Sequence, residues 1–461
     1  MFLFLLFSLW FSEEKPDQIP KVDESLEVNY VLLDVAVTGR DGTHIKDLTK
    51  SDFSIYENKR PVDIQLFDRL DYLDSAGFAP RVVQGQTAPS EEQKAVPRPQ
   101  TLILMLEMAT AQPDTLKNTL AQVREFLYQL RGRSNLAIFI FSLEKGIITR
   151  RFTSSPDLAL IQFDRFQEAY LKDPTPRWDM ARQTSLFGLE EALEDCFQTA
   201  MFGISGGAGG AALGAGTTRS EVQGHLLCLS QAFDSYLVYQ NRRTSSLLEA
   251  LDMVVEGFSK VKGLKSLYLI SPGFSLHPGR SASEMAREYQ RRILQATSSA
   301  SANSSGGQSQ RPIEVAFTPE SYVDRYKFLV QEAARHRIIF NTFTVPLDLE
   351  HKRQNPALGD GALRGNASQY YGFFGDELNE GLMRLAQTTG GIHRNGRQLA
   401  REISTSLEDN RFFYVLGYEK PTNRPKKYRK IKITCNRPGA QLRYREGYHP
   451  NPRGPKRVAE Q

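Results

Sequence analysis

Cysteine is scarce in this chain, which has 461 residues and only Cys196, Cys228 and Cys435. Three widely separated cysteines provide neither the short paired spacing of a zinc site nor a disulfide framework. We therefore interpret all three as small buried apolar residues. Histidine is also sparse, with seven residues and no two at a metal-ligand spacing. These shortages argue against a zinc protein.

The apolar run at residues 1–11, MFLFLLFSLWF, is too short to cross a bilayer as a helix and breaks at once into polar residues. Its length is typical of the apolar region of a secretory signal, although no basic residue precedes it and no small-x-small cleavage site follows it. We interpret residues 1–19 as a signal-like leader. A secreted or periplasmic location follows, with membrane association at most peripheral.

Charge is unevenly distributed along a chain with 40% hydrophobic and 24% charged residues, a composition that excludes a mostly disordered, collagen-like or polytopic membrane protein. Residues 424–457 carry +11 and the remainder about −6, giving the formal +5. Such a basic end could attract phosphate, lipid or nucleic acid. The charges at 430–435 and 442–445 alternate with apolar residues, however, as on the solvated face of a strand pair. We favour that reading and expect no nucleic-acid partner.

The pattern of the chain changes character several times. Residues 20–73 read as strands with a hairpin signal at 58–61, and residues 74–99, with four prolines, read as a linker. Strands and helices alternate over residues 100–409, which predicts a mainly parallel sheet covered on both faces. The Gly-rich 203–216 and Ser-rich 298–310 read as flexible surface inserts.

Strand character returns at residues 410–450, before a tail at 451–461. Neither terminal group of strands is large enough to bury a core alone. The predicted fold is therefore an α/β doubly wound, mainly parallel sheet inserted into a β-sandwich that the N- and C-terminal strands form together.

This order of segments resembles the bacterial VWFA-related proteins of the Acidobacterial type, in the von Willebrand factor type A superfamily. The resemblance spans nearly the whole chain after the leader and rests on residues 31–68, 126–142, 150–160, 263–276, 382–395, 407–421 and 428–450. The closing block, LMRLAQTTGGIHRN followed by LEDNRFFYVLGYEKP and YRKIKITCNRPGAQLRYREGYHP, is the most specific. The resemblance implies a von Willebrand factor A fold for residues 100–409, with strand order near 3-2-1-4-5-6.

Proteins of that fold often hold Mg²⁺ at the carboxyl ends of the strands through an Asp-x-Ser-x-Ser loop, a threonine and a second aspartate. Here the first loop reads Glu107-Met108-Ala109-Thr110-Ala111, the second keeps Thr184, and the third reads Ser271-Pro272-Gly273. Two hydroxyls and one acid are missing, so we predict no functional metal site and no cofactor.

The resemblance leaves Glu107, Thr110, Thr184 and Ser271 as candidate partner-binding residues on that rim. For the three hydroxyl residues we favour the alternative, that they cap helices and strand ends. Glu107 could instead be a structural carboxylate, stabilised by helix N-termini.

Other catalytic patterns are weak. His225 and Cys228 share one predicted helical face, but both lie in an apolar stripe, which favours packing over nucleophilic chemistry. The glycines of 203–216 lack the Gly-Lys-Ser/Thr ending of a phosphate loop, and no Gly-x-Ser-x-Gly or His-Glu-x-x-His pattern occurs. We predict no enzyme.

The sequence thus favours an exported, non-enzymatic module that binds another protein through a degenerate metal-ion-dependent adhesion site. One alternative is metal-dependent adhesion with Mg²⁺ or Mn²⁺ at a rearranged site around Glu107 and Thr184. A further alternative is a hydrolase with an unrecognised site in the loop-rich region 345–376.

Overall fold

A computed structural model gives the arrangement of the chain. It describes residues 30–71, 100–108, 111, 113–131, 136–143, 146–147, 155–172, 186–204, 219–302, 315–345, 364–420, 428–448 and 450. The predicted leader, linker and tail lie outside these residues, as do most of both low-complexity inserts.

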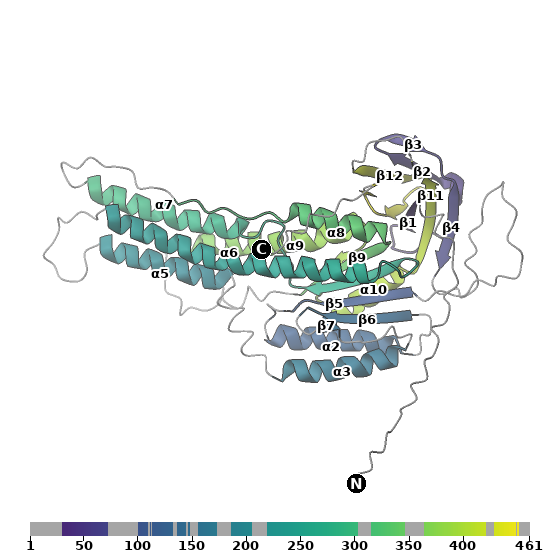
Figure 1. Ribbon diagram of the computed structural model, residues 1–461, viewed down its shortest axis with the longest axis horizontal. Coiled ribbons are helices and arrows are strands. Elements are labelled where there is room, and N and C mark those ends of the chain that lie inside the picture. Colours follow the sequence, from purple (N-terminus) through teal and green to yellow (C-terminus); the bar gives the residue numbers. More distant parts are fainter. Residues whose placement is uncertain are drawn as a thin grey trace, which may run out of the picture.

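The protein is a mixed α/β structure whose centre is a six-stranded sheet (Figure 1). Five strands are parallel and β7 is antiparallel. The strands are β5 (Gln100–Leu106), β6 (Leu136–Ser142), β7 (Gly146–Ile147), β8 (Lys265–Ser271), β9 (Ile338–Thr344) and β10 (His393–Arg394). Their spatial order, β7-β6-β5-β8-β9-β10, equals 3-2-1-4-5-6 in chain order. The nearly continuous apolar runs of β5 and β8 are buried throughout, as expected when helices cover both faces.

Alternate residues of β5 separate the two faces of this sheet. Leu102, Leu104 and Leu106 pack against α2 (Pro113–Gln129), α3 (Pro156–Leu171) and α10 (Leu399–Asp409). Ile103 and Met105 pack against α6 (Arg219–Gly257), α8 (Val323–Arg335) and α9 (Arg364–Thr389). Figure 1 shows α2 and α3 on one side of the strands and α6 and α8 on the other.

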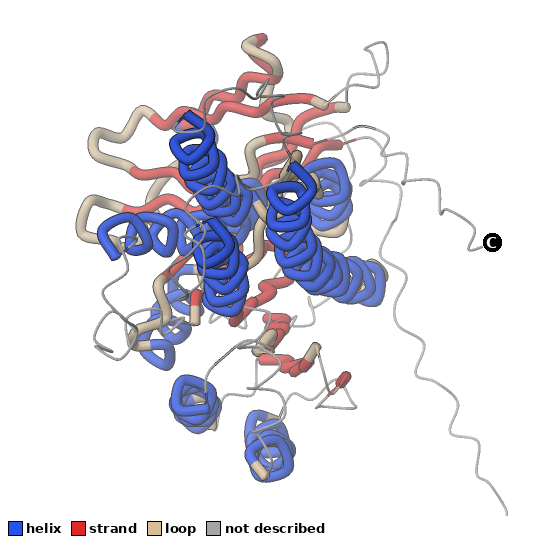
Figure 2. Tube along the Cα trace, turned by 90° about the vertical axis from the view of Figure 1, so that its left-hand side faces the viewer, coloured by secondary structure: helices blue, strands red, loops and turns tan. Residues whose placement is uncertain are grey.

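A helical extension projects from the sheet, built from α5 (Leu186–Ile204), the first half of α6, and α7 (Arg280–Ala302) (Figure 1). Its helices are seen nearly end-on in Figure 2. It has its own apolar core, which includes Leu193, Phe233 and Tyr289 and reaches Leu378 of α9. The sequence analysis missed α7, whose last turns include residues 298–302 of the predicted flexible insert. The sequence pattern did not reveal α3 either.

Cys196 of α5 and Cys228 of α6 form a disulfide inside this extension, with a Cα–Cα distance of 5.9 Å. The interpretation of all three cysteines as unpaired apolar residues was therefore wrong for these two. Short sequence spacing is not needed when two long helices lie side by side, because the partners can be 32 residues apart in sequence.

The segments at the two ends of the chain pair with each other in two four-stranded antiparallel sheets. One sheet has the order β13-β1-β11-β4 and the other β14-β12-β2-β3. The strands are β1 (Tyr30–Thr38), β2 (Phe53–Glu57), β3 (Arg60–Val62), β4 (Leu66–Asp71), β11 (Phe412–Glu419), β12 (Arg429–Cys435), β13 (Gln441–Arg443) and β14 (Gly447–Tyr448). A short η1 (Lys50–Asp52) precedes β2. Side chains from both ends of the chain share one core, in which Leu33, Ile55, Tyr414 and Ile433 are buried.

Two arginines of the basic end bridge these sheets to the α/β part. Arg443 donates to Gly390 O (2.6 Å), one residue after α9, and to Asp409 O (3.0 Å), the last residue of α10. Arg445 donates to Ala334 O (2.7 Å) in the last turn of α8 and to Leu32 O (2.8 Å) in β1. Cations suit helix C-termini because unpaired carbonyls accumulate there. Because these contacts hold both arginines half-buried against helix ends, the prediction of a solvated face is wrong for them, although it holds for the exposed Lys430 and Lys432.

Candidate functional site

The carboxyl ends of β5 and β8 bring two of the predicted site residues together. Glu107 follows β5 directly, and its backbone N–H donates to Ile270 O (2.9 Å), which continues the β5–β8 pairing. Ser271 is the last residue of β8. Its hydroxyl donates to Glu107 Oε2 at 2.6 Å. Adjacent parallel strands therefore place the carboxylate and the hydroxyl side by side, as the sequence predicted.

A third residue completes this group from α6. The guanidinium of Arg243 contacts both oxygens of Glu107, with Nη2–Oε2 at 3.0 Å and Nε–Oε1 at 3.3 Å. Arg243 Nη2 also donates to Gly273 O at 2.7 Å, and Gly273 N donates to Ser271 Oγ at 3.0 Å. We call Glu107, Ser271, Gly273 and Arg243 the crown cluster. Its charged and polar atoms satisfy one another.

The position of Gly273 in the loop after β8 requires a glycine. Its φ of +108° lies in a region that residues with a Cβ rarely adopt, and a Cβ there would lie 2.8 Å from the carbonyl oxygen of Leu378 in α9. Glycine thus lets the loop after β8 pass against α9 while its carbonyl accepts from Arg243.

Burial and charge compensation define the electrostatics of the crown cluster. The side chain of Glu107 has no exposed surface, and that of Arg243 is 7% exposed. Burial disfavours the charged guanidinium, but the charge of Glu107 and its hydrogen bonds outweigh this and raise the pKa of Arg243. The guanidinium of Arg243 therefore stays charged and pairs with the carboxylate of Glu107 as a fixed internal cation.

Sequence analysis did not identify Arg243. A signal was present, because Tyr236, Gln240, Arg243, Leu247 and Leu251 recur at intervals of three and four and are all buried. An arginine within such an apolar stripe implies a buried acid as its partner. The identity of that acid could not be read, because Glu107 is 136 residues away.

The described residues of the predicted binding rim are buried rather than exposed. Glu107 and Ser271 are fully buried, so neither presents surface to a protein partner. Thr110 and Thr184 lie outside the described residues. The surroundings of Glu107 fit the alternative of a structural carboxylate, but Arg243 rather than helix N-termini supplies the positive charge beside it. Within the described ranges, no three His, Cys, Asp or Glu side chains form a group that could hold a metal ion.

The structure also bears on two further features of the sequence, the His225–Cys228 pair and the loop-rich region 345–376. Cys228 forms the disulfide with Cys196, so it supplies no thiolate to His225 while that bond is intact. Of the region 345–376, residues 346–363 lie outside the described residues, and α9 begins at Arg364. Across the part of the chain that is described, every helix falls short of the length or apolar content needed to cross a membrane.

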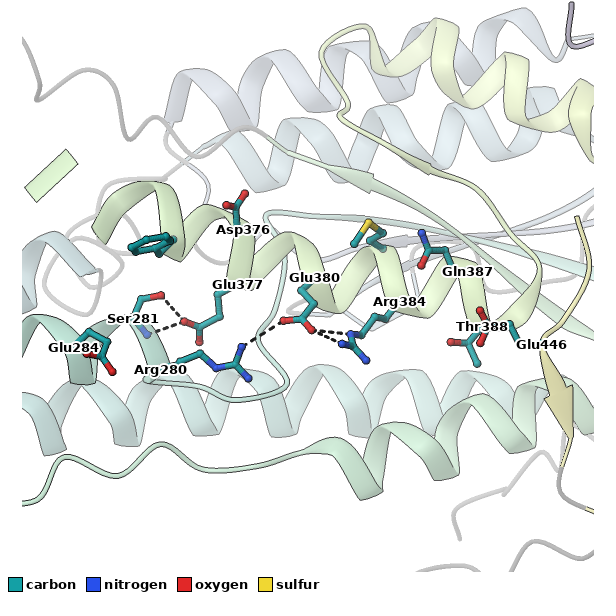
Figure 3. Close-up of a pocket in the computed structure, with 12 residues that line it drawn as sticks. Arg280, Ser281, Glu284, Asp376, Glu377, Glu380, Arg384, Gln387, Thr388 and Glu446 are labelled. Atoms are coloured by element: carbon teal, nitrogen blue, oxygen red, sulfur yellow. Dashed lines mark hydrogen bonds and ion pairs between the residues drawn. The ribbon is translucent and has the colours of Figure 1, made fainter. Parts of the chain in front are cut away.

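A groove of about 640 Å³ lies along α9 (Figure 3). Its lining residues are Arg280, Ser281, Glu284, Phe373, Asp376, Glu377, Glu380, Met383, Arg384, Gln387, Thr388 and Glu446. We call it the α9 groove. Its wall is fixed by the buried Glu377, which accepts from Ser281 N (2.9 Å) at the start of α7 and from Ser275 Oγ (2.6 Å). A carboxylate at a helix N-terminus is stabilised by the unpaired N–H groups there, so α7 and α9 are firmly joined.

Comparison of the chain with protein-family models, curated proteins and solved structures finds no match. The case for function therefore rests on the crown cluster, the α9 groove and the arrangement of the sheets.

Proposed function

We propose that the chain is an exported, non-enzymatic protein-binding module that engages its partner without a metal ion. In this proposal, a von Willebrand factor A-like α/β domain is inserted into a β-sandwich made from the two ends of the chain. The strand order β7-β6-β5-β8-β9-β10 and the pairing of β1 with β11 support this assignment.

The contact between Arg243 and Glu107 carries the metal-free part of the proposal. A cation at the end of β5 would need the carboxylate oxygens of Glu107 as ligands, since Mg²⁺ prefers carboxylate oxygen. Both oxygens already accept from Arg243, and one also accepts from Ser271. The guanidinium thus supplies the positive charge that a metal would supply, and it is covalently part of the chain.

Export is supported by the disulfide between Cys196 and Cys228. Disulfides persist in oxidising compartments such as the periplasm and are rare in the reducing cytosol. The bond agrees with the apolar leader at residues 1–11 in favouring a secreted or periplasmic location.

Two measurements on the full chain test this function. Chemical crosslinking in the periplasm or medium, followed by affinity capture, should recover a protein whose yield is unchanged by EDTA. Calorimetric titration with Mg²⁺ and with Mn²⁺ should give no binding heat. Capture that disappears in EDTA, or a saturating binding heat, would establish metal-dependent adhesion instead.

A hydrolase is tested separately with a broad panel of esterase and peptidase substrates. We expect no turnover above that of a heat-inactivated sample. Turnover abolished by a substitution within residues 345–376 would replace the binding proposal with an enzymatic one.

A further inference from the structure

One face of α9 is left uncovered by the rest of the described structure. The lining side chains on α9 follow helical spacing: Phe373, Asp376, Glu380, Met383, Arg384 and Gln387. Arg280 and Glu284 of α7 border one end, and Glu446, in the turn before β14, borders the other (Figure 3). From 373 to 387 the face is about 21 Å long at 1.5 Å per residue, which matches four turns of a second helix.

The α9 groove is negatively charged within a chain of net positive charge. Its lining includes five acids and two arginines. Both arginines contact the same acid, Glu380, with Arg384 at 2.7 Å and Arg280 at 3.8 Å. Asp376 and Glu446 are exposed, and neither forms an ion pair with another residue in the described part of the chain. These two carboxylates remain available to an incoming cation.

Apolar surface accompanies this charge. Phe373 is 51% exposed and Met383 is 40% exposed, and both line the α9 groove. A concave surface with exposed aromatic and methionine side chains beside acids is suited to an amphipathic segment with apolar anchors and basic flanks. Positive charge on the partner would also speed its association.

We propose that the α9 groove docks a basic amphipathic segment of a partner protein, whose apolar side chains contact Phe373 and Met383 and whose Lys or Arg side chains meet Asp376 and Glu446. This inference rests on the proposed protein-binding function and names the surface and the partner chemistry. It places the interface away from the buried crown cluster.

The first test uses a fluorescein-labelled 15-residue peptide with leucine and lysine at helical spacing, titrated with the full chain by fluorescence anisotropy. We expect saturable binding that weakens as salt rises. A peptide with glutamate in place of lysine should not bind, and one with serine in place of leucine should bind at least tenfold more weakly. Equal binding of the serine peptide would overturn the role of Phe373 and Met383.

Matched variants locate the binding. Asp376→Lys with Glu446→Lys should lower the affinity for the leucine–lysine peptide at least tenfold. Asp324→Lys, which changes a side chain that is 97% exposed and lies outside the groove, should have little effect. Phe373→Ser and Met383→Ser should weaken it several-fold, whereas Phe202→Ser in α5 and Met253→Ser near the end of α6, both at exposed residues away from the groove, should not. Circular dichroism and the melting midpoint check that all variants fold. Equal losses in test and control variants would overturn the proposal.

Two further outcomes would assign the groove to other occupants and overturn the proposed partner. One is tighter peptide binding when Arg453, Lys456 and Arg457 are changed to Glu, which would indicate the chain's own C-terminal segment. The other is self-association by sedimentation that Asp376→Lys abolishes. If crosslinked capture of the natural partner persists in the Asp376→Lys/Glu446→Lys variant, the binding function stands and this location fails.

Discussion

Replacing Arg243 with methionine tests whether a guanidinium balances the buried carboxylate at the end of β5. The substitution keeps much of the apolar stem but removes two contacts to Glu107 and the one to Gly273 O. Among the described residues, Glu107 would retain only the hydroxyl of Ser271 as a side-chain donor. Loss of one partner of a buried ion pair costs about 3–5 kcal/mol, and we expect a decrease of that size in the free energy of unfolding at pH 7.5.

Urea unfolding of the full chain measures this decrease, and a double variant separates its cause. Glu107→Gln/Arg243→Met removes both charges and should recover most of the lost stability, because uncompensated charge rather than lost packing accounts for the cost. Arg325→Met, which removes partly exposed pairs with Glu249 and Asp252 and a hydrogen bond to Ser245, should cost at most about 1 kcal/mol. An Arg243→Met loss below that of Arg325→Met, or a double variant no more stable than the single one, would refute the reasoning.

Two further predictions concern titration and covalent linkage. Burial raises the pKa of Asp252 to about 6, despite the opposing charge of Arg325. The folded-state pKa thus exceeds the unfolded one, so the free energy of unfolding falls as pH rises from about 4 through 6. Asp252→Asn should add about 1 kcal/mol to that free energy at pH 7.5, after allowance for partial exposure, and nothing near pH 4. Urea unfolding measures both values, with Asp324→Asn as the control. Removal of the disulfide by Cys196→Ser/Cys228→Ser should lower the free energy of unfolding in urea by about 2–4 kcal/mol, whereas Cys435→Ser should change it little. Thiol titration of the unfolded chain should find one thiol before reduction and three after. Three thiols before reduction, or a serine pair as stable as the parent, would contradict the linkage.

The sheets were readable from the sequence because their signals are local. The nearly continuous apolar runs of β5 and β8 specify strands buried on both faces, and the alternation in β12 specifies its exposed lysines. Alternation does not reveal what covers a face. For that reason Arg443 and Arg445, predicted to be solvated, proved to contact helix ends.

The candidate site was only half readable for a related physical reason. Glu107 and Ser271 end two strands of one sheet, and parallel pairing places such ends together. Arg243 comes from the middle of a long helix, and its approach depends on how α6 crosses the sheet. The groove depends on α7, which was missed even though Met285, Tyr289 and Ile293 mark a helical stripe.

The position of β11 between β1 and β4 has a consequence for biosynthesis. A ribosome completes β1 and β4 some 340 residues before it makes β11, the strand between them, so both emerge with unsatisfied edges and cannot close their sheet. The intervening α/β part can acquire its own core during that interval. The two antiparallel four-stranded sheets therefore form last. A nascent chain that stalls before residue 412 leaves β1 and β4 with unpaired edges, which are prone to aggregation or proteolysis.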